Sequence, residues 1–370
     1  TKVLNDLVFQ APPAPVIQDL DSQGSCTFGE RVAQAVRMTC PSGAQMQARS
    51  DSTLPGLSAW PPHQPTDVPS ASGQHDSGQD MHNFHHEGFV VADLVRAKGD
   101  LTISVCIPAR NEAATVADVV TRVRQLLDPV GLIDEVVVLE DHSSDGTAEV
   151  AAAAGARVVE AATVAPELVG GAGKGEALWR SLYATRSDLV VWCDADIVDF
   201  DHRFVVGLLG PLLTHPDVAF VKGYYGRPID DSNPSTGGGR VTELMARPVL
   251  ATLFPHLAAI SQPLSGEYAG RRALVEKLPF VRGYGVDLGL LIDAAALAGP
   301  GAVAQCDLGI RRHRNRSLDE LGPQALSVLQ AALDRAGVDV AEPSVLRRPG
   351  QPPLASTFGQ LPPVAELEGC

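Results

Sequence analysis

Two carboxylates on alternate positions, Asp194 and Asp196, end an apolar run that begins at Asp188. Carboxylates that end a strand, rather than lying along it, can converge on a hard divalent cation, which commonly bridges a diphosphate. A short acidic pair is also common at a helix cap or a solvated strand end. Its position at the end of a strand in a nucleotide-type sheet favours the metal, so we expect this acidic pair to bind a divalent cation.

Polar residues also follow two apolar runs upstream. Carboxylates at such places can accept hydrogen bonds from a nucleobase imide or from ribose hydroxyls, which favours nucleotide contact for Glu112 and Asp141. Asp145, Gly146 and Thr147 are better explained as a turn and a helix cap. The donor side therefore has candidate residues at Pro108, Ala109, Arg110, Glu112 and Asp141.

Two glycine-rich segments carry a cation. Lys174 in GAGKGE combines close backbone approach with an ammonium group, which predicts a phosphate site; a flexible linker before a helix is the less favoured alternative. The segment is no Walker A loop, because Gly175 stands where Ser or Thr is required. Downstream, GGGRVT (residues 237–242) places Arg240 and Thr242 at a predicted helix start and indicates a second, separate anion site.

A basic stretch, RRHRNR, covers residues 311–316. It is either a basic surface patch or a local cationic pocket in an otherwise acidic chain. His313 within it could complete the coordination of a metal, because imidazole is a common ligand. His82, His85 and His86 form another cluster, but without matching Cys or carboxylate spacing a surface turn is the better interpretation.

The elements that must position these residues alternate between strand and helix. Apolar runs predict four strands, and helical patterns follow them. This alternation predicts a doubly wound, mostly parallel α/β sheet, in which ligands bind beyond the carboxyl ends of the strands. Every polar cluster named above except the histidine-rich segment falls at such an end or in the less regular second half. The predicted strands are 101–109, 133–141, 156–161 and 188–196, and the predicted helices are 114–127, 147–154, 176–185, 241–253 and 318–336.

The composition of the chain disfavours several classes of function. The chain has 370 residues, 45% of them apolar, and a formal charge of -15, which disfavours binding to nucleic acid or anionic membranes. The six scattered cysteines form no CxxC pattern, no apolar run reaches the length of a membrane span, and no signal peptide is visible. We expect a soluble, cytoplasmic protein with four parts: a low-complexity, largely disordered extension (1–80), a nucleotide-sugar half (81–225), an acceptor half (226–341) and a Pro-rich, mobile tail (342–370).

The ordered motifs PARNE, VVLEDHSSDGT, GKGEALWRSL and CDADI resemble those of glycosyltransferases of the GT-A fold. The second half adds GGGRVTEL, SGEY, RGYGVDLG and HRNR, and with these the chain closely resembles the actinobacterial glucosyl-3-phosphoglycerate synthases over roughly residues 85–340. The resemblance implies transfer of glucose from UDP-glucose to 3-phospho-D-glycerate with retention at the anomeric carbon. It also implies Mg²⁺, or alternatively Mn²⁺, as cofactor, and a homodimer.

The resemblance also implies roles for single residues. The donor would be held by Pro108, Ala109, Arg110, Glu112, Asp141, Lys174, Asp194 and Ala195. Asp194, Glu267 and Lys174 would be the catalytic residues, with Glu267 beside the donor sugar. Asp196 and His313 would bind the metal. The acceptor would be held by Gly239, Arg240, Val241, Thr242 and Asn315.

Some positions depart from the family pattern. Arg110 replaces an apolar residue, Glu140-Asp141-His142 replaces a shorter segment, and Asp287 stands where Glu is common. The first two bear on the nucleotide pocket, so a mannosyl-3-phosphoglycerate synthase using GDP-mannose stays open as an alternative. A catalytically silent nucleotide-sugar-binding protein is a further one, against which the set Lys174, Asp196, Arg240 and His313 argues. A sugar-phosphate nucleotidyltransferase would need a glycine-rich basic loop where this chain has PARNE.

Overall fold

The fold is that of a computed structural model, which describes residues 81–128, 130–226, 239–312 and 317–367. All of these residues belong to one compact unit, Pro62–Cys370. The predicted N-terminal extension, residues 1–80, lies outside the described residues.

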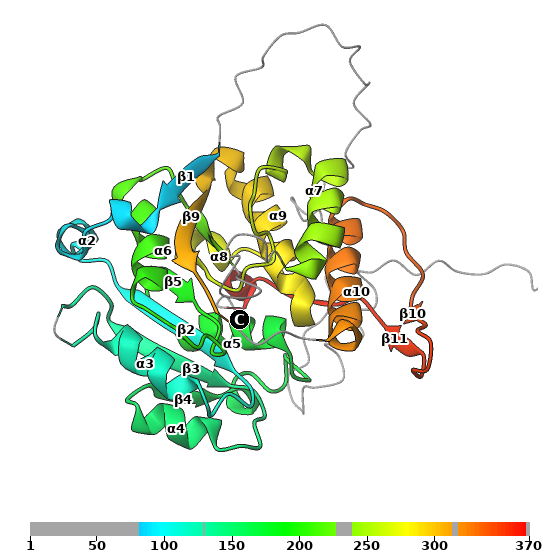
Figure 1. The fold of residues 1–370 in the computed structure, drawn as a ribbon, viewed down its shortest axis with the longest axis horizontal. Coiled ribbons are helices and arrows are strands. Elements are labelled where there is room, and N and C mark those ends of the chain that lie inside the picture. The colour runs from blue at the N-terminus through cyan, green and yellow to red at the C-terminus, as the bar shows by residue number, and fades with distance from the viewer. Residues whose placement is uncertain (1–80, 129, 227–238, 313–316, 368–370) are drawn as a thin grey trace, which may run out of the picture. The chain divides into compact units, whose positions relative to one another are not determined.

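The elements alternate much as the apolar pattern predicts (Figure 1). The strands of the main sheet are β1 (His82–His85), β2 (Ile103–Ala109), β3 (Glu135–Glu140), β4 (Arg157–Glu160), β5 (Leu189–Trp192), β6 (Phe220–Gly226), β7 (Tyr268–Arg271) and β9 (Val303–Ile310). The helices are α2 (Val91–Lys98), α3 (Val116–Arg124), α4 (Thr147–Ala153), α5 (Lys174–Ala184), α6 (Arg203–Thr214), α7 (Arg247–Leu253), α8 (Arg272–Val275), α9 (Val286–Ala298) and α10 (Leu318–Arg335). The remaining strands are β8 (Phe280–Val281), β10 (Ser344–Leu346), β11 (Leu354–Ser356) and β12 (Gln360–Leu361).

In the described part of the chain, eight strands form one sheet in the order β1-β9-β6-β7-β5-β2-β3-β4. All neighbours pair in parallel except β7, which runs antiparallel to β5 and β6. The predicted α/β sheet is confirmed. Because β7 and β9 extend the sheet that β2–β5 begin, the two predicted halves of the chain share one sheet.

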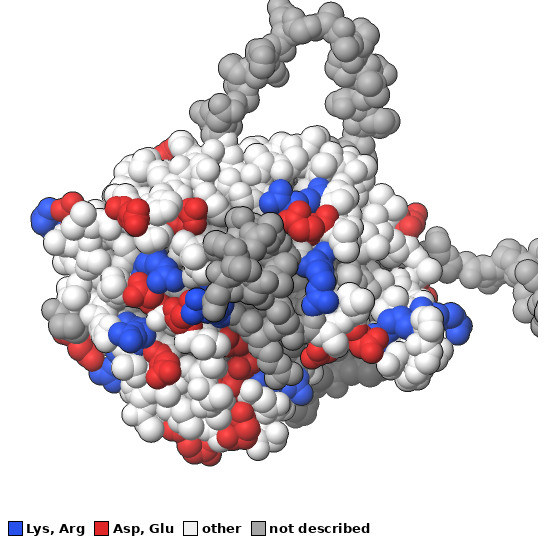
Figure 2. Space-filling view, viewed as in Figure 1, with Lys and Arg blue, Asp and Glu red and all other residues white. Residues whose placement is uncertain are grey.

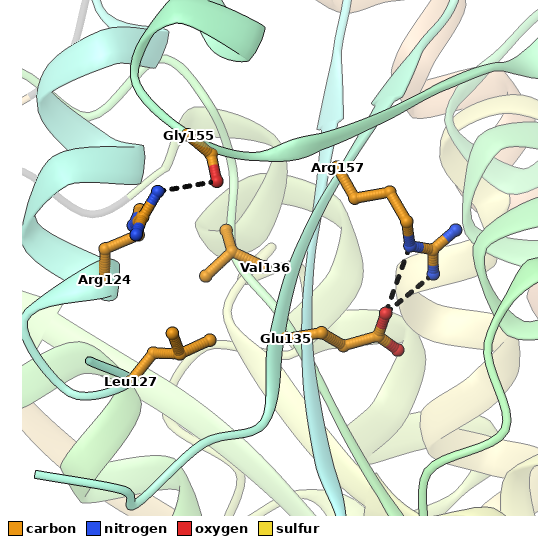
Figure 3. Close-up of a pocket in the computed structure, with 6 residues that line it drawn as sticks. All are labelled: Arg124, Leu127, Glu135, Val136, Gly155 and Arg157. Atoms are coloured by element: carbon orange, nitrogen blue, oxygen red, sulfur yellow. Dashed lines mark hydrogen bonds and ion pairs between the residues drawn. The ribbon is translucent and has the colours of Figure 1, made fainter.

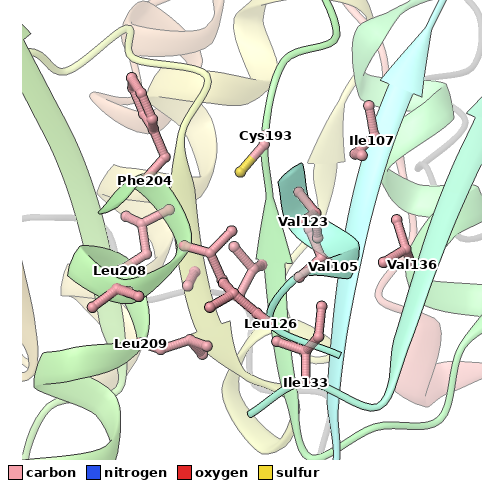
Figure 4. Packing of buried hydrophobic residues seen from close by; sticks show 14 of the residues in the cluster. Val105, Ile107, Val123, Leu126, Ile133, Val136, Cys193, Phe204, Leu208 and Leu209 are labelled. Atoms are coloured by element: carbon pink, nitrogen blue, oxygen red, sulfur yellow. The ribbon is translucent and has the colours of Figure 1, made fainter. Parts of the chain in front are cut away.

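Two apolar layers cover the two faces of the sheet. Successive side chains of a strand point to opposite faces, so Val105 and Ile107 join one cluster and Cys106 joins the other. The first cluster is completed by α3 and α6 (Figure 4), and the second by α5 and α9. Because the parallel strands are buried on both faces, their sequences are nearly continuous apolar runs.

The sequence interpretation needs correction at both ends of the described region. His82–His85 is not a surface turn: it forms β1, which pairs in parallel with β9, and ordered structure therefore begins before Phe89. The tail is not mobile throughout, because β12 pairs with β8 and Trp179 donates its indole N–H to the carbonyl of Pro362 at 2.7 Å. Strand β5 is shorter than predicted, which puts Asp194 and Asp196 just beyond it.

No helix among the described residues is both long and apolar enough to cross a membrane.

Candidate active site

The loops after β2 and β3 are fastened to each other at the carboxyl edge of the sheet. Asn111 accepts a hydrogen bond from the backbone N–H of Ser144 at 2.8 Å, and the N–H of Glu112 donates to the hydroxyl of Thr147 at 2.9 Å. Asn111 and His142 adopt φ values of 57° and 61°, a left-handed conformation that non-glycine residues rarely take. Such conformations persist only where surrounding contacts hold them, and they cluster at functional sites.

Asp145 behaves as the turn and cap residue that the sequence predicts. Its carboxylate accepts hydrogen bonds from the N–H of Thr147 at 3.2 Å and the N–H of Ala113 at 3.2 Å. The hydrogen bond from the Thr147 hydroxyl contributes most to lowering the pKa of Asp145, and the backbone N–H groups add to it. This carboxylate is used to join the two loops, which leaves Glu112 and Asp141 as the candidates for ligand contact.

Asp141 connects the end of β3 to the glycine-rich segment before Lys174. The side chain is buried, and its Oδ2 accepts the N–H of Gly173 at 3.0 Å while Oδ1 lies 3.1 Å from His142 Nδ1. Asp141 thus has a positioning role that sequence reasoning did not assign. The nucleotide contact predicted for it stays a prediction, as do those of Pro108, Ala109, Arg110 and Glu112.

The glycine-rich segment is held by two guanidinium groups, of which that of Arg180 is buried, and is not a flexible linker. Arg180 donates to the carbonyl of Val169 at 2.6 Å and to that of Gly171 at 3.2 Å. Arg282 donates to the carbonyl of Gly170 at 2.7 Å. Gly175 has to be glycine, because a Cβ there would lie 2.0 Å from the carbonyl oxygen of Val281. The backbone before α5 is therefore fixed before any ligand binds.

Lys174, the first residue of α5, lies between two carboxylates. Its Nζ is 3.0 Å from Oδ1 of Asp194 and 3.1 Å from Oδ2 of Asp287. Burial alone would lower the pKa of Lys174, but these two carboxylates outweigh it and raise the pKa above its ordinary value. The ammonium group therefore stays charged across the physiological range.

Arg311, at the end of β9, is the residue that sequence reasoning failed to single out. Its Nη2 lies 2.6 Å from Asp196, 3.3 Å from Asp194 and 3.4 Å from Glu267. Its other terminal nitrogen, Nη1, donates to the hydroxyl of Tyr225 at 2.7 Å. The side chain is only 3% exposed, and although burial opposes its charge, the surrounding acids raise its pKa. The only signal in the sequence was its position at the start of the basic stretch.

Glu267 lies fully buried behind the two aspartates. Its Oε2 accepts hydrogen bonds from Tyr225 at 2.7 Å and from Ser265 at 3.1 Å, and its Oε1 faces Arg311. Gly266 beside it allows close packing, since a Cβ there would lie 2.1 Å from Oδ2 of Asp194. Lys174, Asp194, Asp196 and Glu267, predicted from distant parts of the sequence, thus belong to one network joined by Arg311.

The carboxylates fit a hard cation. Asp196 is 26% exposed at its side chain, so a hydrated cation can reach this carboxylate, whose Oδ1 is paired with a guanidinium nitrogen at 2.6 Å. Mg²⁺ needs only one or two protein carboxylates, since water and phosphate oxygens complete its coordination. Among the described residues no three His, Cys, Asp or Glu side chains form a closed metal site, and the predicted ligand His313 lies outside them.

The predicted acceptor residues begin a π-helical turn, Thr242–Ala246, before α7. Thr242 is buried, Arg240 is exposed and Val241 is half-buried. The carbonyl of Gly239 accepts the N–H of Glu243 at 2.9 Å. Gly237, Gly238 and the predicted acceptor residue Asn315 lie outside the described residues. The acceptor assignment stays a prediction.

A hollow at the opposite edge of the sheet does not compete with this site. It is lined by Arg124, Leu127, Glu135, Val136, Gly155 and Arg157 (Figure 3). Both of its guanidinium groups are engaged, because Arg124 donates to the carbonyl of Gly155 at 3.0 Å and Arg157 to Glu135 at 2.8 Å. On the face seen in Figure 2, acidic and basic side chains are interspersed.

Comparison with known proteins agrees with the site. The profile of the family described as Glycosyl transferase family 2 matches residues 104–262. The glucosyl-3-phosphoglycerate synthase of Mycobacterium tuberculosis is 48% identical over 260 residues, which cover 69% of this chain and 80% of that protein. The enzyme of the same name from Petrotoga mobilis is 42% identical over 259 residues, covering 68% and 80%.

Solved structures point the same way. The Mycobacterium tuberculosis glucosyl-3-phosphoglycerate synthase in complex with Mn²⁺, UDP-glucose and phosphoglyceric acid superposes with a TM-score of 0.72 at 43% identity, covering 78% of this chain and 99% of that one. The same enzyme with Mg²⁺ and UDP gives a TM-score of 0.70, with the same coverage.

Proposed function

The chain belongs to the glucosyl-3-phosphoglycerate synthases, and from this membership we propose how its own residues perform the reaction of that family. The enzyme transfers glucose from UDP-glucose to 3-phosphoglycerate, with Mg²⁺ or Mn²⁺ as cofactor. The observation that carries the residue assignments is the network of Lys174, Asp194, Asp196 and Arg311 at the carboxyl edge of the sheet.

The donor binds across the ends of β2, β3 and β5. The fastened loops that contain Glu112 and Asp141 hold the uridine and ribose, since carboxylates there can accept hydrogen bonds from the imide and the hydroxyl groups. Pro108, Ala109 and Arg110 form the adjoining wall. Lys174 faces the diphosphate, supported by the backbone N–H groups of the segment before α5.

Asp196, with His313, would hold the metal, and Asp194 and Ala195 adjoin it. When bound, the metal neutralises the negative charge that develops on the departing diphosphate. Lys174 contributes in the same way, because its raised pKa keeps it charged beside that leaving group. Arg311 keeps Asp194 and Asp196 close together at a distance that two unscreened carboxylates would resist.

The acceptor binds at the start of the π-helical turn. Arg240 suits bidentate recognition of phosphate or carboxylate, and the hydroxyl of Thr242 with the N–H groups after Gly239 supplies neutral donors. Val241 and Asn315 complete this part of the proposal. The acceptor hydroxyl then approaches the anomeric carbon of the bound glucose from the side of the diphosphate.

Retention proceeds by displacement from the face that the diphosphate leaves. Three carboxylates of the site are already engaged: Glu267 with Tyr225, Ser265 and Arg311, Asp194 with Lys174 and Arg311, and Asp287 with Lys174. A carboxylate held by cations in this way is a poor nucleophile. A leaving phosphate oxygen accepts the proton of the acceptor hydroxyl, and a trapped covalent glycosyl-enzyme would contradict this route.

A homodimer and a cytoplasmic location complete the proposal. Leu244 in the π-helical turn is 80% exposed and Leu318 in the contacting helix α10 is 70% exposed, which suits an apolar interface. The described cysteines, Cys106, Cys193 and Cys306, are buried thiols, as expected in a reducing compartment. Light scattering coupled to size-exclusion chromatography measures the molar mass in solution, which should be twice the 38.9 kDa of one chain; a mass of one chain would contradict the dimer.

A UDP-release assay tests the function. The purified chain is incubated with UDP-glucose, 3-phosphoglycerate and Mg²⁺, and the product is identified by mass spectrometry and its anomeric configuration by NMR. Glucosyl-3-phosphoglycerate of retained configuration, formed only with both substrates and the metal, is the expected result. GDP-mannose in place of UDP-glucose is the matched control, and a preference for it would overturn the assignment of the donor.

A further inference from the structure

A buried lysine that the reaction does not use lies behind the donor site. Lys222, on β6, is 1% exposed. The register places it opposite Tyr268 on β7 and Gln305 on β9. It therefore lies on the face of the sheet that carries Phe220 and Tyr268 of the second apolar cluster. A charged group in such a layer is costly unless it is well paired.

Lys222 is only partly satisfied there. Its Nζ donates to the backbone carbonyl of Asp287 at 3.1 Å and lies 4.1 Å from the centre of the Tyr268 ring. Within the described part of the chain it makes no ion pair, although an ammonium group has three donors. A buried cation held in this way is an unfavourable choice for stability alone.

Both contacts of Lys222 involve Asp287, the residue whose carboxylate pairs with Lys174, one directly and one through Tyr268. The hydroxyl of Tyr268 donates to Oδ1 of Asp287 at 3.2 Å, and Lys174 lies 3.1 Å from Oδ2 of the same carboxylate. Lys222 therefore fixes Asp287 through its backbone and through the ring of Tyr268. Asp287 in turn sets the position of the ammonium of Lys174.

We propose that Lys222 is a positioning residue for donor binding, whose ammonium aligns Asp287 and Lys174 and adds positive charge behind the diphosphate. This inference rests on the proposed contact of Lys174 with the donor diphosphate. Lys222 itself touches no substrate, because its side chain is enclosed by the sheet and by α9.

The inference makes donor binding depend on pH. The pKa of Lys222 is lowered to about 8, chiefly by burial: Asp287 on α9, Glu267 before β7 and Asp194 after β5 oppose this shift, and Lys174 on α5 adds to it. Tyr268 stays neutral in this range because burial raises its pKa, and Lys174 stays charged because its own pKa is raised. Above pH 8 the positive charge behind the diphosphate is therefore lost.

Calorimetric titration with UDP in the presence of Mg²⁺, from pH 7 to pH 9, tests the inference. If only protonated Lys222 supports tight binding, the affinity of the wild type falls about tenfold over this range. Lys222→Met keeps the length of the side chain without its charge, so it binds UDP weakly at pH 7 and loses this pH dependence. Lys98→Met is the matched control, because Lys98 is also buried but lies at the opposite edge of the sheet, paired with Asp134.

The outcomes separate the two proposals. Equal pH dependence in wild type and Lys222→Met, or a wild-type affinity that does not change between pH 7 and pH 9, overturns the role of Lys222. A wild type that binds no UDP overturns the proposed function and this inference with it. Titration of UDP itself affects all three proteins alike. If Lys222→Met does not fold, Lys222→Arg replaces it: a guanidinium keeps its charge through pH 9, so its affinity for UDP should not fall between pH 7 and pH 9, and a fall as large as that of the wild type overturns the role of Lys222.

Discussion

The two edges of the sheet handle charge differently. At the amino edge, charges form small, self-contained pairs, such as Lys98 with Asp134 and Arg157 with Glu135. At the carboxyl edge, the charges are shared: Lys174 contacts two carboxylates and Arg311 contacts three. Two residues with positive φ, Asn111 and His142, also lie at this edge.

The difference indicates what each edge is for. A simple pair satisfies both partners and contributes to stability. A shared network leaves charge to be redistributed when a ligand enters, which is the arrangement expected where anions bind. Substitutions at the carboxyl edge should therefore affect activity, and those at the amino edge should affect stability.

The largest effect is expected for Asp196→Ala. Loss of this carboxylate removes the proposed metal ligand, so kcat falls roughly a thousandfold, and the binding of Mn²⁺ weakens in the absence of substrates. Steady-state UDP release and Mn²⁺ binding by electron paramagnetic resonance measure the two effects. Asp134→Ala, the same change at the amino edge, is the control and retains its activity. Unchanged turnover in Asp196→Ala would show that the metal ligand is assigned wrongly.

A smaller loss is expected for Lys174→Met. Removal of one charged donor that faces a leaving group costs roughly a hundredfold in kcat. Because the pKa of Lys174 is raised by Asp194 and Asp287, its charge does not change between pH 6 and pH 9. The pH–rate profile of the variant should therefore keep its limbs, with the alkaline one moved to higher pH because Lys174 no longer lowers the pKa of Lys222. A limb of that profile that disappears only in Lys174→Met would contradict this assignment.

A substitution at the amino edge should lower the stability of the protein rather than its activity. Lys98→Met removes one partner of an ion pair in which Lys98 is 10% exposed and Asp134 is 41% exposed. Because the exposed partner is screened by water, the free energy of unfolding should fall by only about 1–2 kcal/mol. Urea denaturation measures it, and kcat/KM for UDP-glucose should stay within twofold of the wild type. A large loss of kcat/KM would remove the distinction between the two edges.

The smallest effect is the pH dependence of stability. The folded-state pKa of Lys222 is lowered to about 8, so between this pH and the ordinary lysine value the unfolded chain binds more protons than the folded one. The contribution of Lys222 to the free energy of unfolding therefore rises with pH over that window. Urea denaturation at pH 7.5 and pH 9.5 should show this rise in the wild type relative to Lys222→Met. A fall in the wild type relative to the variant would contradict the lowered pKa.

The sequence alone predicts most of the sheet and half of the site. Long apolar runs followed by polar turns place β2, β3 and β5, and with them the loops that carry Glu112, Asp141 and Asp194. Strand β1 escaped notice because its four residues, HNFH, carry no apolar run. Strand β12 has two residues and depends on pairing with β8, more than seventy positions upstream.

The missing half of the site depends on distant partners. Arg311 pairs with Asp194 across 117 positions, and Lys222 contacts Asp287 across 65. No local pattern distinguishes Arg311 from the other arginines of RRHRNR, or Lys222 from an ordinary strand residue. Only the register of β6, β7 and β9 brings these cations behind the carboxylates.

The central claim is that the metal bound at Asp196 and the acceptor site at Arg240 belong to one reaction centre. The most direct measurement is the paramagnetic relaxation that bound Mn²⁺ induces in the ³¹P resonance of 3-phosphoglycerate, recorded with UDP present. The account predicts a strong enhancement that is lost in both Asp196→Ala and Arg240→Ala. If the enhancement in the wild type were no larger than in Arg240→Ala, the metal-bound UDP and the 3-phosphoglycerate would lie apart, and the claim would be contradicted.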